Sequence, residues 1–162
     1  MFDKFGEFDS CEEINRAVKA QLEEGDLEAI RTIAEENGLD PEDAEDYCTG
    51  AIEELTTPIL AAIGKLELEA KDLKLEGALK DWTDSIKQSC MENEEMALAV
   101  RKKGKSLKDC MAMILKKAFG EKTQLDDRIT KAAGLRPPLY ISIPGKAQIK
   151  EIVREYYLGE KK

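Results

Sequence analysis

The chain has 162 residues, of which 42% are hydrophobic and 36% charged, and its formal net charge is -9. This length suits one domain, or a core domain with a small appendage, and the apolar share excludes a chain that is disordered throughout. The longest useful apolar run, residues 58–64, is far shorter than the roughly 20 residues that cross a bilayer. The first five residues lack the basic and apolar regions of a secretion signal, so we expect a cytoplasmic protein.

The absence of histidine excludes several kinds of catalytic and metal site. Histidine is the most common general base, and it completes the Ser-His and Cys-His nucleophile pairs and most zinc and iron sites. The 4 cysteines are far apart in the sequence. In a chain without a secretion signal we expect reduced thiols that pack as small apolar groups, with a disulfide pairing as the less favoured alternative.

Charge is divided unequally along the chain. Residues 1–54 contain 18 acids and 4 bases, whereas residues 101–162 contain 7 acids and 16 bases. Two interpretations remain open. Either the two parts attract each other and form ordinary solvated helix faces, or each part meets a partner of opposite sign.

Three short helices are expected in the acidic N-terminal part, over about 10–25, 26–38 and 40–50. The first begins with a capping box, in which Ser10 accepts a backbone N–H of the first turn and Glu13 reaches back. Glycines and proline at the expected boundaries support the same division. These helices make up the acidic unit that we expect over residues 1–54.

Residues 55–162 are expected to form a helical core with a basic C-terminal third, either separate from the acidic unit or continuous with it. Helical spacing of apolar residues predicts further helices over about 57–73, 77–91, 93–104, 106–120, 125–134 and 146–158. Residues 66–69 also alternate like a strand, so that segment has two interpretations. The last helix is expected to bury Ile149, Ile152, Val153 and Tyr156. The predicted fold is all-α or nearly so, with five to eight short helices and at most one small β element near 139–143.

Motifs that would support catalysis are weak. Gly104-Lys105-Ser106 is similar to the end of a phosphate-binding loop, but Ala99 stands where that loop needs its first glycine. Acidic residues are numerous, yet none of their groupings fits a calcium loop or a distinct acid/base pair. We therefore expect a protein that is not an enzyme and that needs no metal or other cofactor.

Two sets of charged residues are candidates for contact with a partner. The acidic set lies in the N-terminal part and comprises Glu42, Asp43, Glu45, Asp46, Glu53 and Glu54. The basic set suits contacts to a phosphate backbone and comprises Lys102, Lys103, Lys105, Lys108, Lys116, Lys117, Lys146, Lys150 and Arg154.

The last third of the chain carries a group of capping and packing residues, namely Ser106-Leu107-Lys108-Asp109-Cys110, Ile114, Ala118, Val153 and Tyr156-Tyr157. Over roughly 60 residues this group resembles the PcfK-like family, small proteins of conjugative plasmids, phages and related mobile elements. Two features depart from the family. Leu158-Gly159 replaces the acidic residues that often follow the paired tyrosines, and short members lack the acidic N-terminal part.

The resemblance implies an accessory protein of a mobile genetic element, such as a plasmid or phage, in a bacterial host cell. Proteins related to the family include inhibitors of Cas9, so it implies an anti-CRISPR protein that binds Cas9 with its guide RNA. An acidic surface is compatible with this function, because Cas9 holds nucleic acid in a positively charged channel. The alternative is a DNA-binding accessory protein of plasmid transfer or replication that uses the basic set.

Overall fold

The computed structural model describes residues 2–159, and it confirms the expected all-α fold with one small β element. Across these residues there are nine helices, one more than the upper end of the expected range; α5 and α6, for example, are separate helices on either side of Asn93. The elements in chain order are α1 (Cys11–Glu24), α2 (Leu27–Glu36), α3 (Pro41–Thr49), α4 (Pro58–Asp72), α5 (Ala78–Glu92), α6 (Glu94–Arg101), α7 (Leu107–Gly120), β1 (Thr123–Gln124), α8 (Asp127–Ala132), β2 (Tyr140–Ile141) and α9 (Lys146–Leu158).

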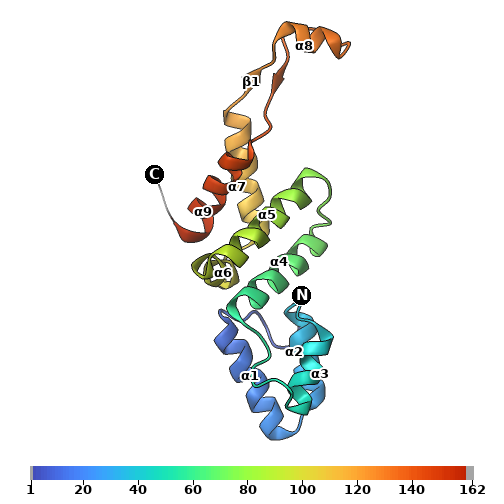
Figure 1. The fold of residues 1–162 in the computed structure, drawn as a ribbon, viewed down its shortest axis with the longest axis vertical. Helices are drawn as coiled ribbons and strands as arrows, with labels where there is room; N and C mark the ends of the chain where they lie inside the picture. Colours follow the sequence, from blue (N-terminus) through green and yellow to red (C-terminus); the bar gives the residue numbers. More distant parts are fainter. Residues whose placement is uncertain (1, 160–162) are drawn as a thin grey trace.

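The molecule is elongated, as Figure 1 shows. Helices α1–α3 form one end, and α4–α7 with α9 form the middle. Beyond them, β1, α8 and β2 extend away from the body at the other end. In the part of the chain that the structure describes, no helix combines the length and the hydropathy that a membrane span requires.

The start of α1 follows its predicted capping box with a small change. The Ser10 hydroxyl accepts the Glu13 N–H at 3.2 Å, as expected. The Glu13 carboxylate accepts the N–H of Asp9 at 2.7 Å, so it reaches one residue further back than the N-cap. Gly25 ends the helix in the left-handed conformation, with φ of 74°, which glycine adopts without a steric penalty.

Residues 66–69 are helical, so the strand interpretation of that segment was wrong. Helix α4, which contains the segment, packs against α5 and α6, and this tertiary contact overrides the local alternation. The buried face of α4 also carries two charged residues, Lys65 and Glu69. An apolar pattern alone does not reveal such a face.

Apolar side chains form two clusters, one in α1–α3 and one in the middle of the molecule. The two parts meet where the chain after α2 passes α4. A Cβ atom added to Gly64 would lie 2.4 Å from the Asn37 carbonyl oxygen, and one added to Gly38 would lie 2.4 Å from the Gly64 carbonyl oxygen. Backbones can approach this closely only because neither glycine has a side chain.

The expected burial of Tyr156 in the last helix was wrong, because Tyr157 takes that place. Tyr157 is 4% exposed in the central cluster, with Ile149, Ile152 and Val153 as expected. Tyr156 packs at the edge of the cluster, and its hydroxyl accepts the Ser106 N–H at 2.9 Å. Ser106 is the N-cap of α7, so this hydroxyl makes the bond that a capping box assigns to its acidic residue.

Residues 119–145 are called the arm below; they comprise the last two residues of α7 and the segment that connects α7 to α9. β1 and β2 pair antiparallel over two residue pairs, and α8 lies at the tip between them. The expected β element near 139–143 is therefore present as β2. The sequence pattern did not indicate its partner strand, because Thr123 and Gln124 are both exposed and the strand buries no apolar residue.

Candidate interaction surfaces

The acidic set lies at the α3 end of the molecule. Glu42, Asp43, Glu45 and Asp46 belong to α3, and Glu53 and Glu54 follow it in the segment before α4. All are exposed except Asp43, which is half-buried. Helix α3 exists here because Asp40 accepts the Glu42 N–H at 2.9 Å and Pro41 occupies the first turn.

One base partly neutralises this acidic surface. The Arg31 guanidinium binds both carboxylate oxygens of Glu45, at 2.5 and 3.1 Å, and it lies 3.5 Å from Glu28. The hydrogen bond from Arg31 holds the pKa of Glu45 below its ordinary value, so Glu45 stays ionised. Among the described residues of α1–α3, Arg31 is the base that forms ion pairs with these acids. Most acids at the α1–α3 end therefore remain available to a partner.

A buried ammonium group joins the N-terminal segment to the core. The Lys65 side chain is 1% exposed, and its Nζ lies 2.9 Å from the Glu7 carboxylate. The same Nζ donates to the carbonyl oxygens of Lys102 and Lys105 at 2.9 and 2.7 Å. All three ammonium protons therefore have acceptors, which is the condition under which a charge is tolerated in a protein interior.

Glu69 extends this buried polar group toward α7. Its carboxylate accepts the Leu107 N–H at 3.0 Å, so it satisfies a backbone donor in the first turn of that helix. Burial raises the pKa of Glu69 above its ordinary value, and the charge of Lys65 opposes that shift. Both charged residues therefore hold the α6–α7 connection against α4.

A second buried contact joins α6 to the end of α2. The Arg101 side chain is almost fully buried, and its Nη2 donates to Asn37 Oδ1 at 2.7 Å. Its guanidinium also lies 5.5 Å from the centre of the Phe2 ring. Burial lowers the pKa of Arg101, and the carboxylates of Glu7 and Glu69 counter that effect. Lys65 and Arg101 therefore fix the acidic end on the body.

The structure does not gather the basic set into one surface. Lys102, Lys103 and Lys105 lie in the connection before α7, close to the N-terminal segment, where Asp9 accepts the Lys103 N–H at 2.8 Å. Lys116 lies near the other end of α7, which is roughly 15 Å away along the helix at 1.5 Å per residue. Lys146, Lys150 and Arg154 belong to a different helix, α9.

Several members of the basic set also have partners within the chain. Lys105 donates to the Tyr156 carbonyl oxygen at 2.7 Å and lies 4.8 Å from the centre of that ring. Lys117 pairs with Glu155, and Lys150 Nζ lies 3.9 Å from Glu92. Lys102, Lys103, Lys108, Lys116 and Lys146 have exposed side chains.

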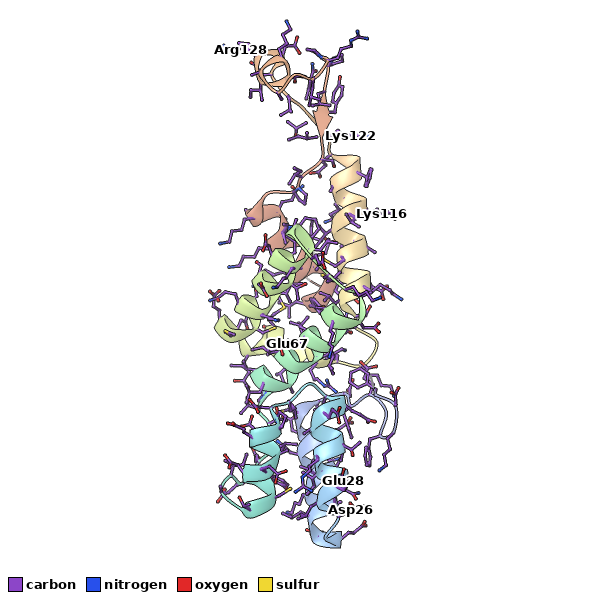
Figure 2. The ribbon with its side chains drawn as sticks, turned by 90° about the vertical axis from the view of Figure 1, so that its right-hand side faces the viewer. Asp26, Glu28, Glu67, Lys116, Lys122 and Arg128 are labelled. Carbon is purple, nitrogen blue, oxygen red and sulfur yellow. The ribbon has the colours of Figure 1, made fainter. Side chains whose placement is uncertain are left out.

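Figure 2 shows how charge is arranged along the molecule. Asp26 and Glu28 lie at the end formed by α1–α3. Lys116 lies on α7, and Lys122 and Arg128 follow toward the tip of the arm. The acids of residues 1–54 thus lie at one end of an elongated body, whereas the bases of residues 101–162 are spread over its middle and its arm. Among the ion pairs of the described residues, Glu7 binds Lys65 of α4 and Lys150 lies beside Glu92 of α5, so both parts pair with the middle of the molecule.

Comparison with protein-family models, curated proteins and solved structures finds no match for this chain.

The described residues contain no group of three Cys, Asp or Glu side chains arranged to hold a metal ion. All four cysteines are free thiols, and Cys90 and Cys110 are buried in the central cluster. Burial raises the pKa of each of these two thiols to about 12, so both are protonated at neutral pH. A protonated, buried thiol is a poor nucleophile.

The arm is the surface that sequence reasoning missed. Of the twelve large apolar residues that are exposed within residues 2–159, six belong to the arm, namely Phe119, Ile129, Leu135, Tyr140, Ile141 and Ile143. The available signal was the nine-residue stretch 137–145, which has no charged residue in a chain that is 36% charged. A stretch of this kind is expected to be buried, and here its large side chains Tyr140, Ile141 and Ile143 are exposed.

Proposed function

We propose that this chain acts by binding a macromolecular partner without catalysing a reaction, and that the partner is Cas9 with its guide RNA. The supporting observation is the concentration of exposed acids on α1–α3 and on the segment before α4, at one end of an elongated molecule. Cas9 holds nucleic acid in a positively charged channel. A surface of this sign competes with DNA for such a channel.

The geometry of the acidic end suits competition with a phosphate backbone. Apart from those of the segment before α4, the acids are carried by short helices whose cores are packed and whose ends are capped, so these helices need no ordering on binding. The contacts of Lys65 and Arg101 fix these helices on the body. A preorganised charged surface loses less conformational entropy on binding than a flexible acidic segment does.

The inhibitor hypothesis is tested with DNA binding and cleavage by Cas9 and guide RNA in the presence of increasing amounts of this protein. The acid-reversal variant replaces four exposed acids with lysine, leaving the Arg31–Glu45 pair intact, at Glu42, Asp46, Glu53 and Glu54. The matched control makes the same change of net charge on the middle of the molecule, at Glu76, Asp81, Glu94 and Glu95. Circular dichroism verifies that both variants are folded.

We expect the wild type and the control variant to inhibit Cas9, and the acid-reversal variant to inhibit it about 100-fold more weakly. The reason is that facing like charges cost several kcal/mol at an interface. Equal inhibition by both folded variants would contradict the role of the acidic end. Absence of inhibition by the wild type, in both binding and cleavage, would contradict Cas9 as the partner.

The same experiment decides the alternative of a DNA-binding accessory protein, which stays a prediction. If the alternative is right, the protein shifts DNA in a gel-shift assay without Cas9. This binding should fall steeply with added salt, because phosphate contacts release counterions. The dispersed positions and internal pairing of the basic set do not favour this alternative.

A further inference from the structure

The arm exposes more apolar side chain than its small size can cover. Ile143 is 76% exposed, Phe119 71% and Ile129 59%. Scattered exposed leucines are normal on a protein surface, but several large apolar side chains within one short projecting segment are characteristic of an interaction site. The arm therefore needs an explanation beyond ordinary surface composition.

The outer edge of β2 has the properties of an unpaired strand that is available for pairing. Thr123 pairs with Ile141, and the Leu125 N–H donates to the Leu139 carbonyl oxygen at 2.8 Å. In an antiparallel pair, hydrogen-bonded positions alternate with non-bonded ones. Tyr140 lies between the bonded positions Leu139 and Ile141, so its own N–H and C=O point away from β1. Free edges of this kind usually carry charged residues or proline that prevent pairing. Residues 139–143 contain neither, but Pro138 and Pro144 flank them, so the edge that is open to pairing is confined to these five residues.

The hairpin itself consists of only two residue pairs, with both strands exposed. Two-stranded hairpins are marginal in water, and three or more strands with an apolar face are needed for independent stability. Pairing β2 with another strand would supply the missing strands and a cover for Ile141 within the strand and for Ile143, two residues beyond it.

We propose that the arm is the interface of a homodimer, in which β2 of one copy pairs antiparallel with β2 of a second copy. An antiparallel pair of identical strands is self-complementary, so one two-fold axis satisfies both copies and closes the assembly. The result is a four-stranded sheet in which the outward backbone groups of Tyr140 have partners. This proposal does not rest on the proposed function.

Charge also favours a second copy at this position. Residues 119–145 contain 4 bases and 3 acids, so the arm is nearly neutral in a chain whose net charge is -9. The acidic helices α1–α3 lie at the opposite end of the elongated molecule. Two copies joined at their arms therefore hold their acidic ends far apart, well beyond the Debye length of about 8 Å at physiological salt.

The available area is adequate for such a dimer. At about 150–250 Å² for a whole large side chain, the exposed fractions of the six arm residues amount to roughly 600 Å² per copy. If two copies covered all six side chains, from Phe119 in α7 to Ile129 in α8, they would bury about 1,200 Å², at the lower end of the range for specific interfaces. We therefore expect a dimer in reversible equilibrium with its monomer.

The test is sedimentation equilibrium of the full chain over a wide range of concentrations. The wild type is expected to shift from 18.1 kDa toward twice that mass as its concentration rises. Replacement of an interface residue, in the variants Ile141→Lys and Ile143→Lys, should raise the dimer dissociation constant by about 100-fold or more. Each copy then loses the burial of one large side chain and places a charge against its partner's charge.

Two further variants make the result specific. Leu60→Lys introduces the same charge at a side chain that is 44% exposed on α4, away from the arm, and should leave the dimer unchanged. Tyr140→Pro removes an outward N–H without removing a bond between β1 and β2, and should weaken the dimer while circular dichroism stays the same. A wild type that is monomeric at all concentrations would overturn the proposal. Dimers that tolerate the arm variants as well as Leu60→Lys would also overturn it.

Discussion

Gly64 offers a sharp test of how the acidic end is fixed on the body. In the interior of an ordinary helix, replacing glycine with alanine stabilises a protein by about 1 kcal/mol. Here the added Cβ would lie 2.4 Å from the Asn37 carbonyl oxygen and 2.9 Å from that of Gly38. Both distances are too short for carbon and oxygen, so the end of α2 must move away from α4.

The displacement would lower the free energy of unfolding in two ways. Overpacking of a close contact costs about 1–3 kcal/mol. Moving Asn37 also strains its hydrogen bond with the buried Arg101, and bonds to a charged group contribute about 1.5–3 kcal/mol. These costs exceed the helix-propensity gain, so we expect Gly64→Ala to lower the free energy of unfolding by about 2–4 kcal/mol. At about 2–4 °C per kcal/mol for a chain of this size, Tm should fall by roughly 5–15 °C.

Chemical and thermal unfolding, followed by circular dichroism, measure this effect. Gly120→Ala is the matched control, since Gly120 is also helical and a Cβ there would meet nothing within 4 Å. The control should be as stable as the wild type or slightly more stable. If Gly64→Ala were as stable as Gly120→Ala, the glycine contact would not determine how α2 and α4 pack.

Three further predictions concern the buried polar groups. Lys65→Met should destabilise the protein by about 3–5 kcal/mol in urea unfolding, because it leaves the Glu7 carboxylate and two carbonyl groups without their buried partner. Lys87→Met, which removes a partly exposed ion pair with Glu67, should change stability by less than about 1 kcal/mol. Glu69→Gln should remove a pH dependence. Since burial raises the pKa of Glu69 in the folded state, the folded state binds a proton more readily than the unfolded state. Wild-type stability relative to Glu69→Gln should therefore rise as pH falls from the raised pKa toward its ordinary value of 4.5, and a difference that is constant with pH would refute this. Tyr156→Phe should cost about 1 kcal/mol by leaving the N-cap N–H of α7 without its acceptor, and an unchanged unfolding midpoint would show that water replaces the hydroxyl.

Local signals in the sequence predicted most of the helices. Capping residues such as Ser10, Asp40 and Ser106 lie at the starts of helices, where their side chains accept first-turn N–H groups. Gly25 and Gly50 end helices in the left-handed conformation. These features involve neighbours within a few residues, so they can be read without knowledge of the fold.

Features that depend on distant contacts were not predictable from the same signals. The burial of Lys65 requires two carbonyl groups that lie 37 and 40 residues further along the chain. The choice between Tyr156 and Tyr157 for the core depended on the direction from which α6 and α7 approach α9. Both tyrosines fit a helical apolar stripe, and the Tyr156 hydroxyl takes up a contact with the Ser106 N–H, 50 residues away in the sequence.

The acidic and basic sets likewise differ in whether their arrangement depends on neighbouring residues or on distant contacts. The acidic set lies within 13 consecutive positions, so its residues remain neighbours in any compact arrangement of the short helix α3. The basic set spans 102–154 and depended on α7 and α9 presenting their bases to one side. The exposed apolar surface of the arm followed from a strand pairing, Thr123 with Ile141, that has no local sequence signature.

The position of Lys65 has a practical consequence for any attempt to divide the molecule. A fragment that begins after α3 would retain this lysine and lose Glu7, leaving an ammonium group inside the protein without its carboxylate. A fragment limited to the first three helices would expose Asn37 and the backbone that now faces Gly64. Inactivity of either fragment would then report misfolding rather than the location of the partner-binding surface. Point substitutions in the full chain are the sound way to assign activity to one end or the other.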